Sequence, residues 1–520
     1  MRLISILSRE GNKIDVPEEV PAFFVDLNLN RLIDEFQNRA KGYEVKKLFY
    51  VFPGNKKEIR YRREVLADLK KDSLFECVRS FTKNMYQARS YFSYSEAVEF
   101  QIQKEMWTLN GAVRYLDAWE GLLAALHNNT IQSEGLLTLA AYMDEVERKE
   151  EFRQWKAETA KVKDLFQNIQ LELTLSGSQI SLAMREDKTT NYNNNLKKLF
   201  PNQWEGEQEK RSRYIETPFH NKLELSGLEC EIVDMLNKMI PEYFKAMHHF
   251  YGVAKNALDD TLMRFEEEVQ FYLSYLDFQK EMESYGFCFT KPVLVEEQEL
   301  KVNGVYDLAL AFKGAKKGRK VISNDAYFNE GEHFFVVTGP NQGGKTTFAR
   351  SMGQMMYFAM MGLEVPAKMA IVPYIDGIIT HFSVEESVET GRGKLKEELT
   401  RLAPMMHETE KNQFVILNEL FTTAATYDSY IMGKNVMEHF MENNCMGIYV
   451  THIRELAEGN ERIVSLVATA SETDYHKRTY RIVRKEAEGV GYAGDMAERF
   501  RLTYPQLKER LQEHGLQKAH

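Results

Sequence analysis

Residues 339–346 read Gly-Pro-Asn-Gln-Gly-Gly-Lys-Thr, and this octapeptide decides the fold of the C-terminal half of the chain. It follows the apolar run Phe334–Val337 and precedes an amphipathic stretch, so the spacing G-x-x-x-x-G-K-T lies between an expected strand and an expected helix. Glycines let the backbone wrap closely around phosphate oxygens, and the helix N-terminus adds the positive end of its dipole. The pattern therefore predicts a phosphate-binding P-loop.

Two side chains of this loop have separate expected roles. Lys345 would reach the β- and γ-phosphates of ATP, and the Thr346 hydroxyl would be a ligand of Mg²⁺. We therefore predict ATP and Mg²⁺ as cofactors. The loop residues expected to hold the nucleotide are Gly339, Pro340, Asn341, Gln342, Gly343, Gly344, Lys345, Thr346 and Thr347.

A second apolar strand, Phe414–Leu417, ends in the polar pair Asn418 and Glu419. Glu419 is the expected general base that polarises the attacking water. Asn418 is the expected second metal residue, but it has no charge, so slow turnover or tight binding with little turnover becomes plausible. An asparagine at a strand end is also a common turn residue. His452 follows another apolar strand, and a γ-phosphate sensor and a structural histidine remain equal readings.

The rest of the chain falls into two kinds of region. From Phe23 to about Asn168 the pattern is helical, and alternation of apolar and polar residues then predicts a β-hairpin at 169–184. Helix returns before a long amphipathic helix, whose apolar stripe from Leu258 to Leu276 is expected to face the core rather than a coiled-coil partner. After Pro292 the pattern becomes β-α-β, so we predict domains at 1–285 and 286–520.

Composition limits the class of protein. The chain has 520 residues, 28% of them charged, a net charge of −10 and 12 prolines, which excludes disordered, collagen-like and disulfide-stapled chains. Four scattered cysteines and the lack of a long apolar run predict a cytoplasmic protein without membrane contact. Because the net charge is negative, any contact with nucleic acid would have to come from local basic patches. The two candidate patches are Lys46 to Arg63 and Lys313 to Lys320, and the simpler interpretation of each is ordinary surface.

The motifs of the C-terminal half together resemble those of the MutS mismatch-repair ATPases, in which Pro-Asn follows the first glycine of the P-loop. The likeness is specific over about 270–505 and only architectural before that. Val321 to Asp325 looks like the family's adenine-side segment, which makes Asn324 a candidate nucleotide-binding residue. The other matching stretches are Leu276-Asp277, Pro292–Leu294, Val365–Ala367, Thr390–Arg392, Ala425–Asp428, and Thr451-His452 with Glu455-Leu456.

This resemblance implies a fold and a function. The expected fold is an α-helical core or lever region with a small β-hairpin insertion, which would be a reduced clamp at about 165–220. An α/β P-loop ATPase domain of ABC type and a helical tail would follow it. The implied function is ATP-dependent binding of double-stranded DNA, mismatched or branched, by a homodimer with composite ATP sites. His452 would be the family's switch histidine.

Three departures from the family pattern qualify this expectation. There is no Phe-x-Glu motif near the start and no length for the mismatch reader, and no Smr-like domain is expected after residue 505. Gly393, next to Lys394, stands where the family has the serine that reaches the partner's γ-phosphate, and Asn418 replaces an aspartate. These changes keep open an alternative, a nucleotide-switched interaction scaffold with little turnover. A transporter or SMC-type ATPase is less favoured, since the L-S-G-G-Q signature is missing.

Overall fold

The computed structural model describes residues 4–11, 17, 19–53, 55–167, 169–176, 179–184, 224–254, 258–382, 394–407, 411–470, 478–487 and 502–513. The chain divides into two compact units. One contains residues 1–4 and 68–266, and the other contains residues 5–67 and 267–520.

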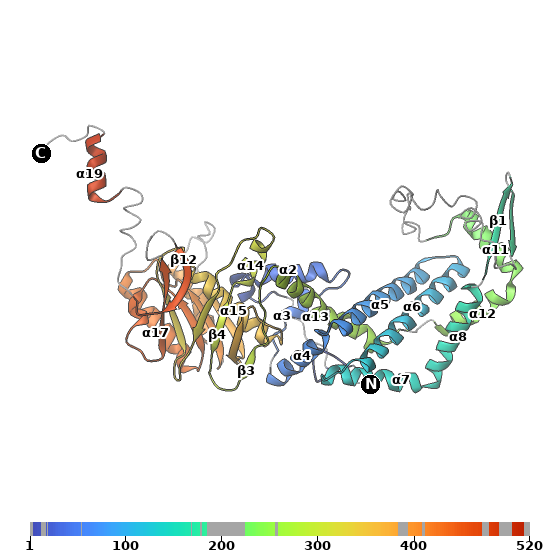
Figure 1. Cartoon of the computed structure of the whole chain (residues 1–520), viewed down its shortest axis with the longest axis horizontal. Coiled ribbons are helices and arrows are strands. Elements are labelled where there is room, and N and C mark those ends of the chain that lie inside the picture. The colour runs from blue at the N-terminus through green and yellow to red at the C-terminus, as the bar shows by residue number, and fades with distance from the viewer. Residues whose placement is uncertain are drawn as a thin grey trace. The chain divides into compact units, whose positions relative to one another are not determined.

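The first unit is helical, as the sequence predicts (Figure 1). Helices α5 and α6 lie side by side, and β1 and β2 form the predicted antiparallel hairpin, in which Leu171 pairs with Met184. The proposed clamp segment at 165–220 lies mostly outside the described residues. The elements of this unit are α5 (Asp72–Ala97), α6 (Gln101–Asn128), α7 (Glu134–Arg148), α8 (Glu150–Gln167), β1 (Leu171–Ser176), β2 (Gln179–Met184), α11 (Gly227–Met239), α12 (Pro241–Ala254) and the start of α13 (Asp260–Ser284).

The second unit contains two β-sheets, whose strands are coloured from yellow to red in Figure 1, with helices around them. The larger sheet has the strand order β12-β11-β6-β10-β9-β8, in which only β12 is antiparallel to its neighbour, and the smaller has the order β3-β7-β4-β5. The fold is thus a helical region with an α/β region, as predicted. Its strands are β3 (Val293–Val295), β4 (Lys301–Val305), β5 (Asn324–Tyr327), β6 (Phe334–Thr338), β7 (Met369–Pro373), β8 (Gly377–Phe382), β9 (Gln413–Asn418), β10 (Met446–Val450), β11 (Ile463–Ala470) and β12 (Arg478–Arg484).

The central strands of the larger sheet are apolar on both faces because helices cover both. Phe334, Val415 and Tyr449 face the cluster that includes Met437 and Phe440 of α17. On the other face, Gly353 of α15 lies so close to Ile416 that an added Cβ would be 2.6 Å from its side chain. The helices of this unit are α1 (Phe23–Asp26), α2 (Leu29–Arg39), α3 (Lys46–Tyr50), α4 (Lys56–Leu69), α14 (Leu308–Ala315), α15 (Lys345–Met360), α16 (Lys394–His407), α17 (Thr426–Glu442), the 3₁₀ helix η3 (Arg454–Ala457) and α19 (Tyr504–Glu513).

Helix α15 explains why residues 5–67 group with the α/β region. Almost every residue from Phe348 to Met360 is buried, so its outer face also needs an apolar cover. The N-terminal segment provides it: Phe24 packs edge-on against Tyr357, and the Tyr357 hydroxyl donates to the carbonyl of Phe49. The sequence places these residues in a helical domain at 1–285, because local helix patterning does not reveal which core a helix joins.

Other sequence expectations have mixed outcomes. The apolar stripe is buried along α13 as expected, whereas its first residue, Leu258, precedes the helix and is partly exposed. In the basic stretch, Lys46 and Lys56 pair with Asp34 and Glu296, as expected of surface, but Arg62 is buried and donates to the carbonyl of Leu7. Among the described residues, no helix is long and apolar enough to cross a membrane.

Candidate functional site

The glycine-rich loop 339–344 joins β6 to α15 and has a conformation that its glycines make possible. Gly339 has φ = 118° and Gly344 has φ = 96°, both in the left-handed region that side chains disfavour. A Cβ on Gly339 would lie 2.8 Å from the carbonyl oxygen of Ala468, and one on Gly343 would lie 2.9 Å from that of Pro340. The loop is therefore closed tightly against β11, and the space inside it is kept for backbone rather than side chains.

Lys345, the first residue of α15, is folded back onto this loop. Its ammonium group donates to the carbonyls of Gly339 at 2.9 Å and Pro340 at 3.2 Å. The residue is only 4% exposed, and burial lowers the pKa of Lys345, an effect that the Glu419 carboxylate opposes. A charged amine held by two neutral carbonyls, next to a helix N-terminus, favours the approach of an anion.

Thr346 and Asn418, the two residues predicted to be metal ligands, are in direct contact. The Thr346 hydroxyl donates to Oδ1 of Asn418 at 3.0 Å, although the two residues lie 72 positions apart in sequence. Asn418 ends β9 and is 7% exposed. Both supply hard oxygen atoms, the ligand type that Mg²⁺ prefers, and Mg²⁺ commonly takes one or two protein ligands and completes its shell with phosphate and water.

Glu419 and His452, the two predicted catalytic residues, also meet. Their strands β9 and β10 are parallel neighbours, so their carboxyl ends lie at the same edge of the sheet. Nε2 of His452 is 3.2 Å from Oε1 of Glu419, and both side chains are partly exposed. Glu419 has φ = 54°, an unusual conformation for a non-glycine residue, and its N–H donates to the carbonyl of Val450. This backbone bond fixes the carboxylate beside the histidine.

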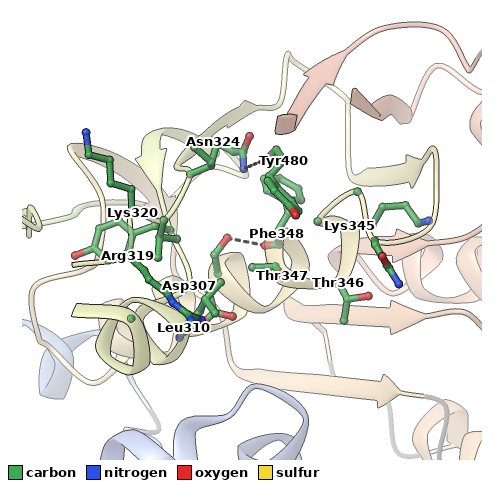
Figure 2. A pocket seen from close by; sticks show the side chains of 18 of the residues that line it. Asp307, Leu310, Arg319, Lys320, Asn324, Lys345, Thr346, Thr347, Phe348 and Tyr480 are labelled. Carbon is green, nitrogen blue, oxygen red and sulfur yellow. Dashed lines mark hydrogen bonds between the residues drawn. The ribbon is translucent and has the colours of Figure 1, made fainter. Parts of the chain in front are cut away.

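A cavity of about 530 Å³ extends from the loop toward α14 (Figure 2). Asn341 to Thr347 and Glu419 line it, whereas Gly339 and Pro340 do not and instead hold Lys345. Asn324 lines it too, but its amide is engaged with β12: it donates to the carbonyl of Tyr480 at 3.3 Å and accepts from the N–H of Ile482 at 2.8 Å. Asn324 therefore positions Tyr480 at the mouth of the cavity.

Several lining residues were not among the predicted site residues. Tyr480 is 51% exposed and has φ = 57°, and no local sequence signal indicates either property. Asp307 lines the cavity as the N-cap of α14, accepting from the N–H of Leu310, and burial raises its pKa. The basic run Lys313 to Lys320 is visible in the sequence as a candidate DNA patch or ordinary surface. The structure instead places four of its side chains on the cavity wall: Lys313, Lys317, Arg319 and Lys320.

The segment that reaches the partner's γ-phosphate in the MutS family falls outside what the structure describes. Gly393 lies in the undescribed segment 383–393, and the side chain of Lys394 is also not described.

The shape of the loop and the chemistry of its ligand atoms show whether these residues fit ATP and Mg²⁺. The loop encloses a cradle that any Cβ at Gly343 would fill, and its single lysine is held by carbonyls alone. The adjacent hydroxyl and amide oxygens are hard ligands beside the carboxylate of Glu419. The residues therefore fit a nucleotide polyphosphate with a divalent cation. Thr346 and Asn418 would hold the cation, which would supply positive charge to neutralise the phosphates.

Fold and site together define an α/β domain with polar residues gathered at the carboxyl ends of its parallel strands. Comparison with known proteins agrees: residues 335–494 match the family model of MutS domain V. The match places this part of the chain in the MutS family, as the motifs predict.

The similarity to individual relatives is local. The chain is 28% identical to the DNA mismatch repair protein MutS of Thermotoga maritima over 172 residues, which are 33% of this chain and 21% of that protein. It is 32% identical to the DNA mismatch repair protein MSH3 of Arabidopsis thaliana over 139 residues, or 26% of this chain and 13% of that protein. The match thus spans about a fifth or less of these relatives' length.

Proposed function

We propose that this chain is an ATP-dependent DNA-binding protein of the MutS mismatch-repair family, in which ATP binding and hydrolysis switch a dimeric DNA clamp or sensor. The observation that carries the proposal is the meeting of three separate sequence motifs at one edge of the sheet. Lys345, Thr346, Asn418 and Glu419 come from two motifs that are 72 or more residues apart, and His452 adds a third strand.

The geometry supports a division of labour in ATP hydrolysis. On nucleotide binding, Lys345 would exchange its two neutral loop carbonyls for phosphate oxygens, whose negative charge complements the ammonium group. Glu419 would polarise the attacking water, and His452 at 3.2 Å would orient that carboxylate and report on the γ-phosphate. Tyr480, half-exposed at the cavity, offers an aromatic face on which a base can stack.

DNA binding and dimerisation are proposed for this chain because its motifs resemble those of the MutS family. The relatives named above are DNA mismatch repair proteins. We propose that the helical first unit contributes to DNA binding, since it lies wholly outside the matched residues 335–494. The chain's net charge of −10 implies that DNA contact is confined to a small part of its surface.

A DNA-structure panel tests this proposal. Filter binding would compare random, mismatched and branched duplexes at several salt concentrations, with and without ATP and Mg²⁺. We expect a nucleotide-dependent preference for one structured duplex, and a salt slope that reports the number of phosphate contacts. Equal affinity for all duplexes in every nucleotide state would reject the DNA function. The variant Lys345→Ala, which should be blind to ATP, is the control for the nucleotide dependence.

A second candidate function is a nucleotide-switched interaction scaffold with little turnover. The observation that favours it is the Thr346–Asn418 hydrogen bond, since a neutral amide holds the metal shell more weakly than a carboxylate would. Steady-state hydrolysis by the wild type and by Glu419→Gln distinguishes the two functions. Turnover that falls about 100-fold or more in Glu419→Gln supports the ATPase. ATP-dependent self-association without turnover in either protein supports the scaffold.

A further inference from the structure

The wall of the cavity that faces the glycine-rich loop is rich in positive charge. Lys313, Lys317, Arg319 and Lys320 all line the cavity, in addition to Lys345 in the loop. Among the lining residues that the structure describes, the only carboxylates are Asp307 and Glu419. Cations therefore outnumber carboxylates five to two in a cavity of a chain whose net charge is −10.

These four cations, which we name the basic wall, also have no partner among the residues that the structure describes. Across the described part of the chain, the charged ends of Lys313, Lys317, Arg319 and Lys320 form neither ion pairs nor hydrogen bonds. Lysines elsewhere on the surface, such as Lys46, Lys56 and Lys156, do form ion pairs. Four unpaired like charges within eight residues repel one another, and a bound anion would relieve this repulsion.

The backbone holds the basic wall in a defined turn. The carbonyl of Gly314 accepts from the N–H of both Lys317 and Arg319, at 2.9 and 3.1 Å, and the N–H of Gly318 donates to Ala315. These bonds close the C-terminus of α14 in the manner of a Schellman motif, with Gly318 at φ = 63°. The helix dipole favours cations in its last turn, which accounts for Lys313, but Arg319 and Lys320 lie beyond the helix end.

The basic wall and the loop lie at different ends of the cavity. Figure 2 shows Arg319 and Lys320 on one side of the view and Lys345 and Thr346 on the other, with Asn324 and Tyr480 between them. A nucleotide whose 5′-phosphates occupy the loop would extend its ribose and base past Tyr480 toward the basic wall. An anionic group of such a nucleotide that reached the wall would therefore belong to its ribose end.

We propose that the basic wall binds a second phosphate group, carried on the ribose 2′ or 3′ oxygen of an adenine nucleotide whose 5′-phosphates occupy the glycine-rich loop. This inference rests on the proposed nucleotide function and deepens it. The protein then distinguishes ribose-phosphorylated nucleotides from plain ADP or ATP. The ligand chemistry is one phosphate monoester, and its attachment to the 2′ or the 3′ oxygen gives two sources that an experiment separates.

Titration calorimetry of the full chain would compare ADP with its 2′-phosphorylated and 3′-phosphorylated derivatives at low and moderate salt. We expect one derivative to bind about tenfold or more tightly than ADP, as charge-assisted hydrogen bonds to phosphate predict, with a gain that shrinks as salt rises. The triple variant Lys317→Ala/Arg319→Ala/Lys320→Ala should lose this gain but keep its ADP affinity, which also shows that it is folded.

Lys316→Ala is the matched control. Lys316 belongs to the same turn but does not line the cavity, and its ammonium lies 5.5 Å from the Phe312 ring centroid. Its variant should retain the full preference. The inference would be overturned if the wild type bound all three ligands equally, or if the triple variant still bound one derivative more tightly than ADP. In either case, ADP binding by the wild type would still support the nucleotide function. If wild type binds no ADP, both fail. A triple variant that loses only duplex-DNA affinity would reassign the wall to nucleic acid.

Discussion

The two walls of the cavity differ in how their polar groups are paired. On the loop side, polar groups satisfy each other: Lys345 binds two carbonyls, Thr346 binds Asn418, and His452 pairs with Glu419. On the α14 side, four exposed cations have no partner among the described residues. The loop side is thus pre-organised, and a ligand bound there would replace contacts within the protein. A ligand bound to the basic wall would replace no such contact, because its cations are unpaired among the described residues. Substitutions on the two sides should therefore differ in size and kind.

The largest effect is expected for Lys345→Ala. The phosphates would lose their main cationic partner in a buried setting, so nucleotide affinity should fall about 100-fold or more. Fluorescent-nucleotide titration of the folded variant measures this loss. Wild-type affinity in Lys345→Ala would show that the loop is not the phosphate site.

A pair of glycine substitutions compares the backbones of the two walls. Gly339→Ala places a Cβ 2.8 Å from the Ala468 carbonyl at φ = 118°, so we expect a loss of unfolding free energy of about 3 kcal/mol and a distorted loop. Gly318→Ala meets nothing within 4 Å and should cost only about 1 kcal/mol for its positive φ. Denaturant unfolding of both variants tests this order, and equal losses would contradict the difference in packing between the walls.

Asn418→Asp should strengthen Mg²⁺ binding on the loop side of the cavity. Restoring a carboxylate beside Thr346 strengthens the hold on Mg²⁺, so the Mg²⁺ concentration for half-maximal turnover should fall by about tenfold. Steady-state hydrolysis across a Mg²⁺ series gives this value. An unchanged Mg²⁺ dependence would mean that Asn418 is only a turn residue at the end of β9.

The smallest effect is expected on the basic wall with plain ADP. Lys320→Ala should change ADP affinity by less than about twofold, since exposed charges that do not contact the ligand are screened at physiological salt. Equilibrium titration alongside Lys345→Ala provides the contrast. If Lys320→Ala lost as much ADP affinity as Lys345→Ala, the 5′-phosphates would bind at the basic wall rather than in the glycine-rich loop.

Local patterns were sufficient for much of the fold. The hairpin β1–β2, the long α13 and the α/β character of the C-terminal half follow from periodicity, because alternation and helical repeats are properties of neighbouring residues. The membership of residues 5–67 in the α/β unit did not follow, since it depends on the outer face of α15, which only packing defines. For the same reason the burial of Arg62 inside a basic stretch was not foreseen.

By itself, the sequence determined the loop, the strand-end residues Asn418, Glu419 and His452, and the family, because these motifs are short and contiguous. Only the tertiary structure decided their meeting: parallel strands bring their carboxyl ends to one edge, so Thr346 contacts Asn418 and Glu419 contacts His452. It also turned the Lys313–Lys320 run from a surface patch into a cavity wall, and placed Tyr480 beside it. Charge along a chain shows how many cations exist, but the fold decides what they face.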